Sequence, residues 1–173
     1  RPMPRQRRLA KEHLLKRARH AFELLIPDTS VIIEGLLSTR LAKGEWTAKA
    51  VMVHEAVMAE LEAQANRRKE IGYQGLEEVK RLRELCAKKN IAYSFSGSRP
   101  TGFEIKYARV GEIDALIRDL AAQEKGTLVT ADVVQSLVAE SKGIKVLLVE
   151  IKEQEIPIPL AKYFDEHTMS VHL

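Results

Sequence analysis

Five short aliphatic runs, separated by stretches with helical spacing, constrain the fold of this chain more than any other feature. The runs lie at residues 22–28, 48–54, 91–96, 127–130 and 145–150. Amphipathic helices are expected at residues 29–44, 55–72, 75–90, 112–126 and 132–143, and a loop at 97–102. Strands that are apolar throughout, rather than alternating, are typical of a parallel sheet buried on both faces. The sequence therefore predicts an α/β fold with helices on both sides of a parallel sheet.

The distribution of charge predicts how the chain is divided. Residues 1–20 carry eight Lys or Arg against one acid, although the net charge of all 173 residues is only +4. We expect a basic N-terminal arm or helix at 1–22, one domain at 23–152, and a C-terminal extension or linker at 153–173. The arm is suited either to phosphates or to solvent. Because the first residue is not Met and the end breaks off an alternating pattern, we expect a fragment of a longer protein.

Several classes of protein are disfavoured by what the sequence lacks. No apolar run approaches the roughly 20 residues that span a bilayer. Cys86 is the only cysteine, which excludes an internal disulfide and fits a reducing cytoplasm. The glycine motifs of nucleotide-binding loops and the GxSxG motif of serine hydrolases are missing. Met58 stands where an HExxH zinc site would need its second histidine.

Acidic residues recur where an α/β sheet carries function. Asp28 follows the first aliphatic run and Asp132 follows the fourth, and sites in such sheets gather at the carboxyl ends of strands. Glu60 shares a helical face with Val53, Ala56 and Val57, so its carboxylate is expected near the core without a basic neighbour. Asp114 flanks the predicted core stripe of Ile113, Leu116, Ile117 and Leu120.

Two interpretations of these acids stay open at the level of the sequence. Asp28, Asp114 and Asp132 all precede or begin helices, where Asp is a favoured cap worth about 1 kcal/mol. Alternatively, four converging carboxylates repel one another and require protons or a divalent cation. Ligation by oxygen alone favours Mg²⁺ or Mn²⁺ over zinc.

Four segments together resemble the PIN domain, the PilT N-terminus-like ribonuclease domain. They are "IPDTSVII", "HEAVMAELE", "GEIDALIRDLA" and "TLVTAD". Residues 99–121 and 163–173 resemble, more narrowly, the N-terminal module of archaeal ATPases that also carry a KH domain. The resemblance implies a three-layer sandwich around a five-stranded parallel sheet in the order 3-2-1-4-5. It also implies a metal-dependent endoribonuclease whose Mg²⁺ or Mn²⁺ is held by Asp28, Glu60, Asp114 and Asp132.

Further roles follow from the same resemblance. Ser30 and Thr130 would position a water or a phosphate oxygen, although ordinary strand-end and helix-start hydroxyls explain them slightly better. Contacts to single-stranded RNA would come from Arg99, Lys106 and Arg109, although an ordinary solvated surface explains these residues equally well. The implied partners are RNA, KH and ATPase domains in the longer protein, and a second copy of the chain.

Two other functions are compatible with the residues. The domain could serve the ATPase without catalysis, by binding RNA or by oligomerising. A phosphorylation switch at Asp28 would need a lysine after the last strand, and Lys152 is the candidate.

Overall fold

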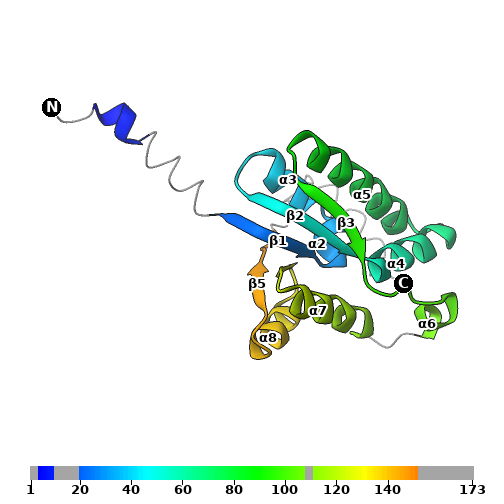
Figure 1. Cartoon of the computed structure of the whole chain (residues 1–173). Helices are drawn as coiled ribbons and strands as arrows, with labels where there is room; N and C mark the ends of the chain where they lie inside the picture. The colour runs from blue at the N-terminus through cyan, green and yellow to red at the C-terminus, as the bar shows by residue number, and fades with distance from the viewer. Residues whose placement is uncertain (1–3, 10–19, 108–110, 152–173) are drawn as a thin grey trace, which may run out of the picture.

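The computed structural model describes residues 4–9, 20–107 and 111–151. Its centre is a parallel sheet of five strands in the order β3-β2-β1-β4-β5, as predicted (Figure 1). The strands are β1 (Ala21–Pro27), β2 (Thr47–His54), β3 (Ala92–Ser96), β4 (Thr127–Thr130) and β5 (Lys145–Leu148). The strand order reverses at β1, whose two neighbours are β2 and β4.

Seven helices connect the strands in the described part of the domain. They are α2 (Thr29–Ile33), α3 (Leu36–Ala42), α4 (Glu55–Asn66), α5 (Glu70–Lys88), α6 (Gly102–Tyr107), α7 (Glu112–Glu124) and α8 (Val133–Ser141). No helix among the described residues is both long and apolar enough to cross a bilayer.

Successive side chains of β1 pack into two cores on opposite faces of the sheet. The fold therefore has three layers, with helices on each side of the sheet. Leu25 packs with side chains of α3 and α5, including Leu37 and Leu82. Ile26 packs on the other side with side chains of α4, α7 and α8. Figure 1 shows α5 and α3 on one side of the sheet and α7 and α8 on the other. The predicted three-layer α/β architecture is confirmed, and Cys86 is buried within α5 as its helical setting suggests.

Several predicted boundaries are wrong, each for a local reason. Residues 29–44 form two helices rather than one, because Gly35 adopts a left-handed conformation (φ 65°) that ends α2 and starts α3. Gly44 does follow the end of α3, with φ 69°. Leu116, expected in the core stripe of α7, is 37% exposed. Part of the predicted loop at 97–102 and the residues after it form α6, a helix that sequence patterning missed.

The predicted helix end at Gly72 is also wrong. The chain turns at Arg67 and Arg68, and α5 runs through Gly72. A Cβ at Gly72 would lie 2.2 Å from the backbone nitrogen of Ala65. The glycine is therefore there because α4 and α5 touch through their backbones, not because a helix stops.

Candidate functional site

A cavity of about 520 Å³ opens at the carboxyl edge of the sheet, beside the point where strand order reverses. It lies where sites in open α/β sheets are expected. All four acids predicted from the sequence line it. The lining residues are Asp28, Thr29, Ser30, Ile33, Glu60, Ala63, Gln64, Arg67, Ile105, Gly111, Ile113, Asp114 and Asp132.

Asp28 is fixed at the junction of β1 and α2 and is only 3% exposed. Its Oδ1 accepts a hydrogen bond from the backbone N–H of Thr29 (2.8 Å), so it caps α2. Its Oδ2 accepts from the hydroxyl of Thr130 at the end of β4 (2.9 Å). The backbone N–H of Asp28 donates to the carbonyl of Val129 (2.8 Å). Capping and orientation toward the cavity are thus compatible in this residue.

Two carboxyl groups of the cavity have raised pKa values, so their ionised forms are disfavoured. The pKa of Asp28 is raised to about 6, chiefly because the carboxyl is buried and next because Asp114 is negatively charged. The pKa of Glu60 is also raised by burial, and Asp114 adds to the shift. A hydrogen bond from the Thr29 hydroxyl to Glu60 (3.3 Å) partly opposes it. Asp114, in the first turn of α7, therefore helps to raise the pKa of both Asp28 and Glu60.

Asp132 has a different setting from the other three acids. It is exposed, and its Oδ1 accepts from the backbone N–H groups of Val134 (2.8 Å) and Gln135 (3.4 Å), which makes it the N-cap of α8. Its own N–H donates to the Thr130 hydroxyl (3.1 Å). The carboxylate lies at the cavity rim and is used as a cap.

The residues fit a hard divalent cation by the type of donor. The acids of the cavity supply only oxygen ligands, which Mg²⁺ and Mn²⁺ prefer. Among the ion pairs of the described residues, none contains Asp28, Glu60, Asp114 or Asp132. Within the same part of the chain, no three His, Cys, Asp or Glu side chains are already arranged around one metal position. The carboxylates would have to draw together by side-chain rotation to enclose an ion.

The two hydroxyls considered in the sequence differ in setting. Thr130 is fully buried, does not line the cavity, and holds Asp28 and the backbone of Asp132 in place. Ser30 does line the cavity, and its buried Oγ has no hydrogen-bond partner in the described structure.

Of the cationic residues singled out in the sequence, Arg99 and Lys106 do not line the cavity. Arg99 pairs with Glu62 on the exposed side of α4, and Lys106 belongs to α6. Arg109 lies outside the described residues, as does Lys152, the candidate for a phosphorylation switch. Among the described residues, the cation that lines the cavity is Arg67, which sequence reasoning missed. Its spacing of seven residues from Glu60 on α4 was the available signal.

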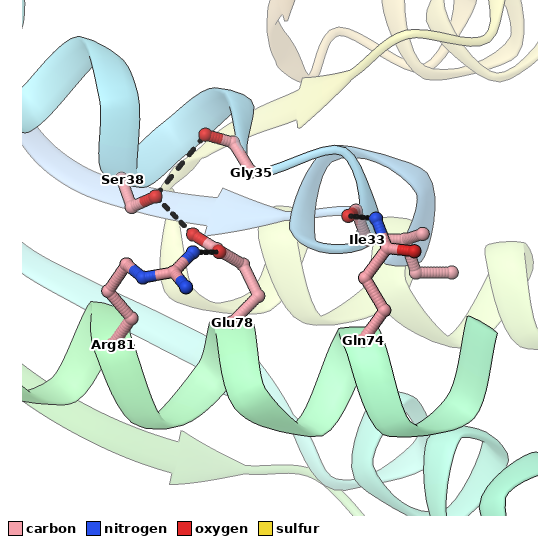
Figure 2. A network of polar contacts seen from close by, with 6 residues as sticks. All are labelled: Ile33, Gly35, Ser38, Gln74, Glu78 and Arg81. Atoms are coloured by element: carbon pink, nitrogen blue, oxygen red, sulfur yellow. Dashed lines mark hydrogen bonds and ion pairs between the residues drawn. The ribbon is translucent and has the colours of Figure 1, made fainter. Parts of the chain in front are cut away.

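A buried acid outside the cavity was missed as well. Glu78 of α5 is 5% exposed, and it accepts hydrogen bonds from Ser38 of α3 and from Arg81 (Figure 2). The Ser38 hydroxyl also contacts the carbonyl of Gly35 (3.2 Å). Because these partners satisfy its charge, Glu78 is a structural acid that fastens α3 to α5.

Comparison with known proteins agrees with this architecture. The model of the PIN domain family matches residues 25–141. The chain is 43% identical over 146 residues to an uncharacterised KH and PIN-domain containing protein of Methanocaldococcus jannaschii, covering 84% of this chain and 23% of that protein. It is 31% identical over 149 residues to the Holliday junction branch migration ATPase PINA of Sulfolobus acidocaldarius, covering 86% of this chain and 27% of that protein.

A solved structure has the same fold. It is a domain of a functionally unknown protein from Methanocaldococcus jannaschii, 38% identical, with a TM-score of 0.73 over 79% of this chain and 97% of that one. This chain spans about a quarter of the length of the two longer relatives. It belongs to the PIN domain family, whose members are typically nucleases that use divalent metals.

Proposed function

We propose that this chain is a metal-dependent endoribonuclease module of a larger ATPase, and that Asp28, Glu60, Asp114 and Asp132 bind Mg²⁺ or Mn²⁺. The observation that carries the proposal is the clustering of Asp28, Glu60 and Asp114 in one cavity. Burial and mutual repulsion raise the pKa of Asp28 and Glu60, and no basic side chain of the described structure pairs with any of the three. A bound divalent ion would compensate this charge, lower the pKa of a water and neutralise charge on the phosphodiester.

The residues of the cavity have distinct roles in this proposal. Asp28 is oriented by Thr29 and Thr130, so its carboxylate is presented with little freedom. Glu60 accepts a hydrogen bond from the Thr29 hydroxyl, and its carboxylate oxygen that does not bind the ion would take the proton from the attacking water. The water oxygen forms a bond to phosphorus, the bond from phosphorus to the leaving ribose oxygen breaks, and that oxygen takes up a proton. The Ser30 hydroxyl, which has no hydrogen-bond partner among the described residues, is available to hold the water.

The test is cleavage of single-stranded RNA in Mn²⁺ by the wild-type chain and by Asp28→Asn. Asp119→Asn is the matched control, because Asp119 is exposed on the same helix as Asp114 and does not line the cavity. Loss of even an indirect contact to a metal lowers activity by roughly 10- to 100-fold, so Asp28→Asn should lose about 100-fold or more. Asp119→Asn should cleave like wild type. Equal cleavage by all three proteins would defeat the proposal.

A noncatalytic module that binds RNA or oligomerises is the second candidate. It is favoured by one observation: the carboxylates of the described residues are not preassembled around a metal position. This function predicts RNA binding or self-association that Mn²⁺ does not alter. A four-way DNA junction belongs in the same assay, because one relative is a Holliday junction branch migration ATPase.

A further inference from the structure

One face of α4 follows the cavity from its acidic end to its rim. Glu60, Ala63, Gln64 and Arg67 line the cavity and are spaced by three or four residues, so they lie on the same side of the helix. Arg67 is the C-cap residue of α4 and is exposed. It is the only cationic residue that lines the cavity in the described structure.

The guanidinium group of Arg67 forms no ion pair within the described part of the protein. Four acids nevertheless line the same cavity. An arginine at the end of a helix also favours the helix dipole, but Arg68, which follows directly, supplies the same stabilisation. The dipole therefore does not explain why Arg67 is the cation at the cavity.

The position of Arg67 suits contact with a phosphate next to the one that would react at the acids. Seven residues along an α-helix correspond to about 10 Å between Cα atoms, a span that leaves room for one phosphate at the acids and for its neighbour at the guanidinium group of Arg67. The guanidinium group binds phosphate oxygens in a planar, two-pronged geometry. Gln64 lies between the two, and its buried Oε1 has no hydrogen-bond partner in the described structure.

We propose that Arg67 binds the backbone phosphate next to the scissile one, so that the single strand runs along α4 from Glu60 past Gln64. This assignment rests on the proposed function, since the scissile phosphate is placed at the acids. Arg67 offsets the repulsion between the acidic cavity and the strand, and it fixes the strand's direction across the site. It is a substrate-binding residue and takes no part in the bond changes.

The test compares Arg67→Gln with Arg68→Gln, two neighbouring substitutions that each remove one positive charge. Arg68 is exposed and does not line the cavity. Binding of a labelled single-stranded RNA is measured by fluorescence anisotropy in EDTA and in Ca²⁺ over a range of salt concentrations. A lost charge-assisted hydrogen bond corresponds to roughly a 10-fold weaker Kd or more for Arg67→Gln. The dependence of log Kd on log salt should become shallower by about 0.7. Arg68→Gln should change Kd less than about twofold, as a surface charge outside the site.

Cleavage in Mn²⁺ separates this inference from the proposed function. If the wild-type chain cleaves RNA, Arg67→Gln should raise KM more than it lowers kcat, because the contact exists before the transition state is reached. Arg67→Lys should recover part of the affinity. Equal effects of Arg67→Gln and Arg68→Gln overturn the inference even if Mn²⁺-dependent cleavage is found, and so does a wild-type chain that binds no RNA. Selective weakening without any cleavage supports the strand-binding role of Arg67 and defeats the nuclease.

Discussion

Asp28 is the residue at which the requirements of folding and of function conflict. It is 3% exposed, it faces Asp114, and its pKa is raised to about 6. The folded chain therefore binds the Asp28 proton more tightly than the unfolded chain does. The resulting stability is present at low pH and is lost as pH rises from about 4 to about 6, by roughly 3 kcal/mol. At neutral pH the ionised carboxylate destabilises the metal-free protein.

Asp28→Asn should therefore make the metal-free chain more stable at neutral pH. The change removes the buried charge and leaves an amide oxygen to accept from Thr29, so we expect a gain of about 1–3 kcal/mol. Thermal unfolding in EDTA measures it, with a rise in Tm of about 2–4 °C per kcal/mol. The gain should vanish at a pH where the wild-type carboxyl is protonated. A variant that is less stable than wild type in EDTA at neutral pH would show that the charge of Asp28 is already compensated.

Single residues also show how far the sequence predicts the site. The four acids were found because strand ends and helix faces can be inferred from apolar spacing, and all four line one cavity. The caps that Asp28 and Asp132 form were one of the two interpretations open at the level of the sequence. Asp28 is also held by Thr130, through a hydrogen bond between residues 102 positions apart, and contacts of this kind were not predictable. Such contacts depend on how β1 and β4 pair, which no local pattern contains.

At the scale of the elements, α5 holds the helices that begin at the site. Glu78 binds Ser38 of α3, and the side chain of Gln74 donates to the carbonyl of Ile33 at the end of α2 (3.1 Å, Figure 2). Helix α2 starts directly after Asp28. The placement of the first acid therefore depends on contacts that α5 makes from outside the cavity.

Ser38→Ala should destabilise the chain by about 1–3 kcal/mol, because the buried Glu78 carboxylate loses a hydrogen-bond donor. Denaturant unfolding measures the change. Ser98→Ala, at an exposed serine in the loop after β3, is the control and should be neutral within about 0.5 kcal/mol. A Ser38→Ala chain as stable as the Ser98→Ala chain would mean that Arg81 alone satisfies Glu78.

The contact of α4 with α5 gives a second test at this scale. Alanine is normally favoured over glycine within a helix by about 1 kcal/mol, but a Cβ at Gly72 would collide with the backbone of Ala65. We expect Gly72→Ala to destabilise the fold by roughly 1–3 kcal/mol. Gly102→Ala is the matched control, since a Cβ there meets nothing within 4 Å. An increase in Tm for Gly72→Ala would show that the two helices are not in backbone contact.

The same contact explains why the sequence misplaced an element boundary. Glycine in a helical pattern indicates either an end or a close approach, and only the neighbouring helix decides which. Gly35 shows the opposite case, in which a glycine interrupts what looks like one helix. The strands were easier to predict, because a continuous aliphatic run needs no partner to be identified.

At the scale of the whole molecule, the chain contains the five-stranded sheet of its PIN domain. It spans about a quarter of the length of the two longer relatives that it matches. Figure 1 shows α4 and α7 beside the carboxyl ends of the strands, and residues of both helices line the cavity. The fold therefore brings the four acids to one cavity.

Binding of a divalent ion should stabilise this unit in a manner that depends on pH. An ion at about 100 times its Kd adds about 2.7 kcal/mol to the free energy of unfolding. Because the ligands must be deprotonated, the rise in Tm with Mn²⁺ should be large above the raised pKa of Asp28 and small below it. Thermal unfolding with and without Mn²⁺ on both sides of about pH 6 measures this. A rise in Tm that does not change with pH would place the ion elsewhere.

The central claim is that the acids of the cavity bind a divalent metal, and the most direct test is a crystal structure with Mn²⁺ and an anomalous difference map. We predict a Mn²⁺ peak within about 2.0–2.6 Å of carboxylate oxygens from at least two of Asp28, Glu60 and Asp114. The peak should be absent from crystals of Asp28→Asn grown in the same conditions. A map of the wild-type chain with no peak in the cavity, at a Mn²⁺ concentration that supports RNA cleavage, would contradict the account.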